Sequence, residues 1–292
     1  MKPASKKDMS FSINDAISEG GDLLRKAGIA EARREAGSLL AHALSRDRTF
    51  LIMNANELLS AEQTEAFRSF IERRARQEPL QYITGHQEFF NLDFEVTPDV
   101  LIPRPETEMV VESALDLLKD VSMPFIGDIG TGSGCIAISL LHELPRARAV
   151  ATDISRPALR VAQQNANRHG VSDRLALIES DFFSTLDRSS RFSLIVSNPP
   201  YIGEDDWKSL PREVRDHEPR AALVSGVDGL ADIRRLLDEA PSFLRSDGYF
   251  VFEIGFDQSA RVDKMIEADT WDLLEIRSDL QGIPRTVVLR KK

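Results

Sequence analysis

The first eighty residues carry the hydrophobic spacing of amphipathic helices and little strand signal. Leucines and alanines between positions 39 and 44 recur on one helical stripe. Ser60 and Gln63 form a capping-box pattern, and apolar residues follow at helical spacing, which predicts a helix over 61–76. We therefore expect residues 1–80 to form a small helical bundle.

From residue 125 onward the pattern changes to short apolar runs that alternate with helix-length segments. The predicted strands are 125–129, 149–153, 175–178, 192–197, 249–254, 273–276 and 286–289. The first five are typical of a parallel, doubly wound α/β sheet. Between the two regions, residues 89–96 alternate like a hairpin, and Pro105 opens a helix. We therefore divide the chain into a helical domain (1–80), a linker with a β-hairpin (81–105) and a catalytic α/β domain (106–292).

Composition and charge narrow the class of function. The chain has 292 residues, more than the usual single core of about 100–200 residues. Lys+Arg and Asp+Glu number 13 and 12 over 1–80 (net +1) but 24 and 35 over 81–292 (net −11). An acidic catalytic domain disfavours stable nucleic-acid binding and favours a basic protein partner.

The lone Cys135 rules out an internal disulfide, favours a reducing compartment and is interpreted as a small buried filler. No apolar run approaches the roughly 20 residues that span a bilayer, so we expect a cytoplasmic protein without membrane association. The histidines show no metal-ligand spacing, and no metal is expected.

The most informative motif is Asn198-Pro199-Pro200-Tyr201, which directly follows the apolar strand that ends at Ser197. The two prolines lack N–H groups and have fixed φ, so the chain cannot continue in the sheet. The side-chain oxygen of Asn198 and the backbone carbonyl of Pro199 can then accept both hydrogens of a substrate NH2 group, beside an aromatic face. A Pro-Pro turn closed by a core aromatic is the structural alternative.

A glycine-rich loop follows the first predicted strand. Its residues are Gly130, Thr131, Gly132, Ser133 and Gly134. Such glycines let the backbone approach a ligand, and the helix that follows offers unpaired N–H groups. Cys135 stands where a dinucleotide fingerprint has its third glycine, which disfavours a nicotinamide cofactor. Asp153 ends the next strand, where an acidic residue meets ribose hydroxyls, although it could also cap a helix. Together these features predict nucleoside binding.

Three further blocks extend the pattern: residues 101–108 (LIPRPETE), 180–183 (SDFF) and 213–223 (EVRDHEPRAAL). With the glycine loop and the Asn198 turn, in this order, they resemble the HemK/PrmC family, the protein-(glutamine-N5) methyltransferases of peptide chain release factors. The resemblance covers nearly the whole chain, strongly from Pro79 onward. It implies a class I, Rossmann-like methyltransferase domain with a seven-stranded sheet whose last two strands form an antiparallel hairpin, preceded by a helical bundle.

The resemblance also implies S-adenosyl-L-methionine as the cofactor. The loop from Gly130 to Gly134 would hold its methionine side and ribose, and Asp153 would take both ribose hydroxyls. Asp181 would bind the adenine amino group, and Phe182 would stack on adenine. Asn198 would border the cofactor as well as the substrate.

The substrate implied by the resemblance is the glutamine in the Gly-Gly-Gln motif of release factors. Asn198 and Pro199 would orient its side-chain amide for methylation at N5, Pro200 would keep the turn rigid, and Tyr201 would flank the amide. The helical domain, which has no catalytic motif, would dock the release factor. The roles of Arg104, Glu106, His217 and Glu253 stay open.

Two other functions are compatible with parts of this sequence. An adenine-N6 DNA or RNA methyltransferase would present the same NH2 donors, but base flipping needs a basic groove. A non-catalytic, cofactor-binding assembly factor belongs to a different class, and the intact Asn198 and glycines argue against it. The basic run at residues 73–76 is interpreted as a solvated helix terminus rather than a nucleic-acid site.

Overall fold

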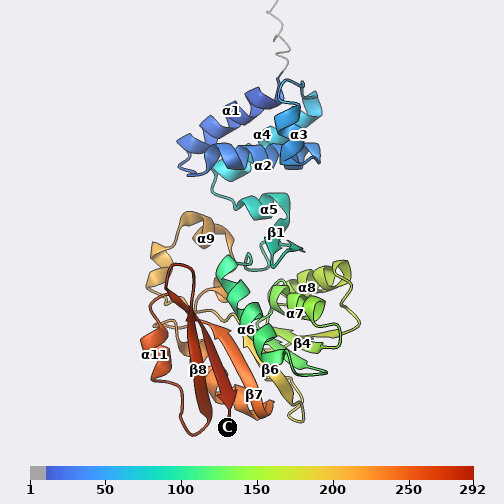
Figure 1. Ribbon diagram of the computed structural model, residues 1–292. Coiled ribbons are helices and arrows are strands. Elements are labelled where there is room, and N and C mark those ends of the chain that lie inside the picture. The colour runs from blue at the N-terminus through green and yellow to red at the C-terminus, as the bar shows by residue number, and fades with distance from the viewer. Residues whose placement is uncertain (1–10) are drawn as a thin grey trace, which may run out of the picture. The chain divides into compact units, whose positions relative to one another are not determined.

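The computed structural model describes residues 11–292, and the chain divides into two compact units (Figure 1). The helical unit comprises the chain up to Gly85 together with Arg212–His217, and the α/β unit comprises His86–Pro211 and Glu218–Lys292. The sequence-based division differs from this one in two ways. The predicted linker 81–105 is split, with 81–85 in the helical unit and 86–105 in the α/β unit, and residues 212–217 also belong to the helical unit.

The helical unit is a bundle around one apolar core. Its helices are α1 (Ile13–Lys26), α2 (Ala32–Leu44), α3 (Arg48–Met53), α4 (Ala61–Ala75), α5 (Leu80–Thr84) and α9 (Arg212–His217). The predicted capping box begins α4: the Ser60 hydroxyl accepts from the Gln63 N–H at 3.2 Å, and the Gln63 side chain accepts from the Ser60 N–H at 2.9 Å. Phe67 and Ile71 then lie on the buried face of α4.

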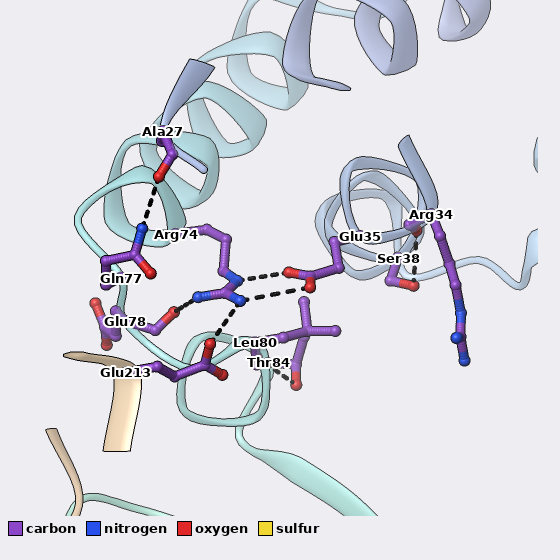
Figure 2. Close-up of polar contacts among 10 residues, drawn as sticks. All are labelled: Ala27, Arg34, Glu35, Ser38, Arg74, Gln77, Glu78, Leu80, Thr84 and Glu213. Carbon is purple, nitrogen blue, oxygen red and sulfur yellow. Dashed lines mark hydrogen bonds and ion pairs between the residues drawn. The ribbon is translucent and has the colours of Figure 1, made fainter. Parts of the chain in front are cut away.

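One member of the basic run at the end of α4 departs from the prediction of a solvated terminus: Arg76 is exposed, but Arg74 is only 4% exposed. Its Nε donates to Glu35 at 2.5 Å, Nη1 donates to the Glu78 carbonyl at 3.1 Å, and Nη2 donates to Glu213 at 2.8 Å (Figure 2). Acceptors from three other segments compensate the burial of the guanidinium. Since Glu213 lies on α9, this cluster accounts for the grouping of α9 with the helical unit.

The α/β unit begins with a hairpin and continues as alternating strands and helices. The hairpin strands are β1 (His86–Phe89) and β2 (Leu92–Glu95). The sheet strands are β3 (Phe125–Ile129), β4 (Arg148–Asp153), β5 (Leu175–Glu179), β6 (Phe192–Ser197), β7 (Leu244–Glu253), β8 (Trp271–Ser278) and β9 (Pro284–Lys291). The helices are α6 (Glu108–Leu118), α7 (Cys135–Glu143), α8 (Arg156–Arg168), α10 (Ala231–Glu239) and α11 (Ser259–Asp263). A single 3₁₀ turn, η1 (Pro105–Thr107), precedes α6.

The sheet has the predicted seven strands, in the order β5-β4-β3-β6-β7-β9-β8. Strands β3 to β7 pair in parallel, and β9 pairs antiparallel with both β7 and β8. One core packs α6, α7 and α8 on one face, and a second core packs α10 and α11 on the other. All six residues of β6 are buried, which explains its continuous apolar run.

The parallel register brings several predicted site residues to one edge of the sheet. In β3 and β4, Ile129 pairs with Thr152, so the glycine loop and Asp153 leave the sheet side by side. Strand β6, the other neighbour of β3, ends at Ser197 and delivers Asn198 to the same edge. Ligands of open α/β sheets bind at the carboxyl ends of the strands, so this edge is the candidate site.

Candidate functional site

A cavity of about 400 Å³ opens at this edge, within the α/β unit. Nine of the predicted site residues line it: Gly130, Thr131, Gly132, Ser133, Asp153, Asp181, Phe182, Asn198 and Pro200. Within residues 11–292, its wall does not include Gly134, Pro199 or Tyr201. The cavity has the size of a small-molecule site and reaches from the glycine loop to the Asn198 turn.

The glycines of the loop serve two different purposes. Gly130 and Gly132 have φ of 78° and 56°, and a Cβ at either position would meet no atom within 4 Å, so the backbone conformation is what requires glycine there. Gly134 also has a positive φ, of 84°, and in addition a Cβ there would lie 2.8 Å from Ile138 Cδ1 and 3.2 Å from Ala162 Cβ. Gly134 therefore allows α7 and α8 to pack closely and contributes to the site indirectly.

Asp153 holds the glycine loop in place. Its Oδ2 accepts from the Gly132 N–H at 2.9 Å, and its Oδ1 accepts from the Ser155 N–H at 2.8 Å. Burial raises the pKa of Asp153. The helix-capping role falls to Ser155, whose hydroxyl accepts from the Ala158 N–H at 3.3 Å. Of the two interpretations of Asp153, the structure shows a carboxylate in the cavity wall rather than the cap of α8.

Asp181 and Phe182 both contact an arginine that the sequence did not reveal as their partner. Arg235 on α10 donates through Nη1 to Asp181 Oδ1 at 2.6 Å, and its guanidinium lies 4.7 Å from the centroid of the Phe182 ring. Phe182 has φ of 51°, in the left-handed region that a bulky side chain rarely adopts. Strain of this kind clusters at ligand sites, and Phe182 is one of the residues that line the cavity.

Asn198 belongs to a buried polar chain. Its Nδ2 donates to Thr107 Oγ1 at 3.0 Å, and Thr107 Oγ1 donates to Glu253 Oε2 at 2.6 Å. The Tyr201 hydroxyl donates to Glu253 Oε1 at 3.0 Å. Burial raises the pKa of Glu253, and the Glu253 charge, together with burial, raises the pKa of Tyr201 well above its usual value. Sequence reasoning left Glu253 without a role and did not single out Thr107; a carboxylate that ends an otherwise apolar strand was the available signal.

Two further acidic groups flank the cavity. Asp128 is fully buried behind the loop, where its Oδ2 accepts from Thr131 Oγ1 at 2.7 Å and from the Ala137 N–H at 3.2 Å. Burial raises the pKa of Asp128 to about 6. Arg104 forms an ion pair with Glu218, which also accepts from the Ile102 N–H at 3.3 Å. Arg104, whose role the sequence left open, thus has a buried carboxylate as its partner.

The thiol of Cys135 is buried, and burial raises its pKa to about 12, which keeps it protonated at neutral pH. Within residues 11–292, no group of three or more His, Cys, Asp or Glu side chains is placed to hold a metal ion. None of the helices in this part of the chain combines the length and apolar character that crossing a membrane requires.

The sheet order and the glycine loop at its carboxyl edge define a class I methyltransferase fold. The hMettl16 catalytic domain, solved in complex with MAT2A 3′UTR hairpin 1, shares this fold with a TM-score of 0.57 at 15% identity, over 87% of this chain and 90% of that one. Family models for the PrmC N-terminal domain and the methyltransferase small domain match residues 15–85 and 113–210.

Two relatives are similar over most of their length. The release factor glutamine methyltransferase of Nitratidesulfovibrio vulgaris is 40% identical over 100% of this chain and 98% of the relative. The enzyme of the same name from Moorella thermoacetica is 46% identical over 88% of this chain and 90% of the relative. The chain therefore belongs to the release factor glutamine methyltransferase family, the HemK/PrmC family, and is an S-adenosylmethionine-dependent methyltransferase.

Proposed function

We propose that this chain uses S-adenosyl-L-methionine to methylate N5 of the glutamine in the Gly-Gly-Gln motif of peptide chain release factors. The observation that carries the proposal is the single cavity that joins the glycine loop, Asp153 and Phe182 to Asn198. A nucleoside-binding half and an amide-binding half thus share one space, which a transfer between two bound molecules requires.

The residues at the cofactor half fit S-adenosylmethionine. The Ser133 hydroxyl lines the cavity, and its neighbour there is the Cys135 thiol, which is only a weak hydrogen-bond partner, so this hydroxyl can still bond to a ligand. The loop of Gly130 and Gly132 gives a ligand close access to the backbone. In this proposal Asp153 accepts from the ribose hydroxyls, Asp181 accepts from the adenine amino group, and Phe182 stacks on adenine. When bound, the cofactor supplies an activated methyl group on a sulfonium sulfur.

The amide-binding half has to position a weak nucleophile. A primary amide nitrogen delocalises its lone pair into its carbonyl, so orientation is the main contribution a protein can make. Asn198 Oδ1 and the Pro199 carbonyl accept the two amide hydrogens and hold the nitrogen toward the methyl group. The same acceptors stabilise positive charge as it develops on that nitrogen, so they act most strongly in the transition state.

All residues of the described chain that line the cavity belong to the α/β unit, and we propose that the helical unit docks the release factor. A docking surface adds binding energy that a short peptide does not gain. The intact factor should therefore show a kcat/KM at least tenfold above that of a peptide spanning its Gly-Gly-Gln loop, an expected factor of the size that one docking contact provides. Equal values for both substrates would contradict a docking role.

Asn198→Ala tests the catalytic proposal. We expect kcat to fall about a hundredfold or more, the scale seen when one preorganised transition-state contact is removed, while cofactor affinity is retained. Asn167→Ala is the matched control, because Asn167 is an exposed asparagine of α8 that bonds only to neighbours on the surface. Methyl transfer to the release factor is measured by mass spectrometry of the Gly-Gly-Gln peptide.

Two results would contradict the proposal. Undiminished turnover by Asn198→Ala would exclude a role of the Asn198 side chain in orienting the substrate. If methyl groups were found only on adenine in nucleic acid, the enzyme would be an adenine-N6 methyltransferase, and the proposed role of Asn198 would still hold.

A further inference from the structure

Glu253 lies at the end of β7 with only 1% of its surface exposed. An ionised carboxylate can only accept hydrogen bonds. Two hydroxyls supply them, one to each oxygen: Thr107 to Oε2 at 2.6 Å and Tyr201 to Oε1 at 3.0 Å. The charge of Glu253 therefore fixes the direction in which both hydroxyl hydrogens point.

The direction of the Thr107 hydrogen determines what Asn198 can do. A hydroxyl has one hydrogen, and Thr107 gives it to Glu253, so only lone pairs of its Oγ1 remain for Asn198. Asn198 can approach those lone pairs only with its NH2 group, at the observed 3.0 Å. The choice between the two ends of the Asn198 amide thus follows from the network itself and needs no independent assignment of nitrogen and oxygen.

We propose that Glu253 and Thr107 are positioning residues that fix Asn198 with its oxygen, rather than its NH2 group, available to the substrate. This inference rests on the proposed function, in which Asn198 Oδ1 accepts a hydrogen from the glutamine amide. Oδ1 accepts no hydrogen bond from the described part of the chain, while Asn198 lines the cavity.

The alternative orientation of the Asn198 amide shows why the hydrogen-bond relay from Glu253 through Thr107 to Asn198 matters. A flipped Asn198 would direct NH2 hydrogens at the NH2 hydrogens of the substrate, so that donor would face donor. Its Oδ1 would face the lone pairs of Thr107, so that acceptor would face acceptor. Both mismatches leave polar groups unpaired in a poorly solvated site, which costs far more than in water. A neutral Glu253 removes this discrimination, because it can donate its own O–H to Thr107 and release the Thr107 hydrogen toward Asn198.

The charge state of Glu253 depends on its neighbours from several elements. Besides the hydroxyls of Thr107 and Tyr201, the positive charge of Arg285 on β9 lowers the pKa of Glu253, and the negative charge of Glu106 on η1 raises it. Burial is the largest influence and raises the pKa above its usual value. Because the ionised form is the active one, kcat should fall as the pH falls through this raised pKa.

The test uses the full-length protein, S-adenosylmethionine and a peptide containing Gly-Gly-Gln. Thr107→Val keeps the shape of the side chain and removes the hydroxyl, whereas Thr107→Ser keeps the hydroxyl. We expect Thr107→Val to lower kcat about 10- to 100-fold, with KM and cofactor affinity within about threefold of wild type, and Thr107→Ser to restore most of the activity. Glu253→Gln should lower kcat similarly and should lack the acidic limb that we expect in the pH profile of wild type.

A second readout needs no substrate. The side-chain NH2 resonance of Asn198, identified by its loss in Asn198→Ala, should shift in Thr107→Val and stay near its wild-type position in Thr107→Ser. This measurement remains decisive if Glu253→Gln does not fold.

The outcomes separate the relay from the proposed function. The relay alone is overturned if wild type methylates glutamine and Thr107→Val keeps the full kcat. It is also overturned if the Asn198 resonance does not move in Thr107→Val. A failure of Thr107→Ser to restore activity also overturns it, because a structural role of the methyl group would then suffice. If wild type does not methylate glutamine at all, the proposed function fails and the catalytic role of the relay fails with it.

Discussion

Replacement of Asp153 by alanine should weaken the binding of S-adenosylmethionine. The carboxylate accepts from the Gly132 and Ser155 N–H groups at 2.9 and 2.8 Å, and in the proposed complex it also accepts from the two ribose hydroxyls. Removing charge-assisted hydrogen bonds to a partly buried group costs about 2–4 kcal/mol. We therefore expect the Kd for S-adenosylmethionine to rise roughly 30- to 800-fold.

The chain offers a closely matched control. Asp187 accepts from the N–H of Ser189, two residues further along the chain, at 2.8 Å, just as Asp153 accepts from the Ser155 N–H. Unlike Asp153, Asp187 is exposed. Asp187→Ala should therefore leave the Kd unchanged, and it measures what the loss of such a turn contact does by itself.

Titration calorimetry with S-adenosylhomocysteine and its 2′,3′-dideoxy analogue separates the two functions of Asp153. If the carboxylate binds the ribose hydroxyls, wild type should bind the analogue much more weakly, and Asp153→Ala should lose little further affinity for it. Equal affinity of wild type and Asp153→Ala for S-adenosylhomocysteine would refute the assignment. Equal loss for both ligands would restrict Asp153 to holding the loop at Gly132.

Two predictions concern the stability of the units. Arg74→Met leaves Glu35 and Glu213 without their cation, so it should destabilise the helical unit by about 2–4 kcal/mol and speed amide hydrogen exchange in α9. As a control, Arg68→Met breaks an exposed ion pair and should cost under about 0.5 kcal/mol. Unchanged exchange in α9 of Arg74→Met would contradict the prediction. Burial raises the pKa of Asp128 from 3.8 to about 6, so the folded state holds a proton that the unfolded state releases. Stability should therefore fall by about 2–3 kcal/mol as the pH rises from 4 to 6, and urea unfolding of Asp128→Asn should lack this component, whereas parallel curves for the two proteins would exclude it.

The sheet could be predicted from the sequence because its signals are local. A strand such as 192–197 is buried on both faces and reads as a continuous apolar run, and Pro199 and Pro200 mark its end unambiguously. Parallel pairing then places the ends of β3, β4 and β6 at one edge. The glycine loop, Asp153 and Asn198 could be placed at this edge for the same reason, since each directly follows a recognisable strand.

Contacts between distant segments could not be predicted in this way. The burial of Arg74 depends on Glu35, 39 positions earlier, and on Glu213, 139 positions later. The role of Glu253 depends on Thr107, 146 positions before it. A basic run at a helix end and an acid at a strand end have ordinary local explanations, and only the folded chain supplies the partners that override them.

The block at residues 213–223 shows a further limit of reading a motif as one site. Its first part, Glu213 to His217, belongs to the helical unit, where Glu213 pairs with Arg74. Its second part begins with Glu218 in the α/β unit, where this buried carboxylate binds Arg104, and continues with residues such as Pro219 that line the cavity. The division falls at a single peptide bond. The contacts of Glu213 and Glu218 therefore have different functions: Glu213 stabilises the helical bundle, and Glu218 helps to shape the cavity wall. Substitutions at these two positions should be tested by different measurements.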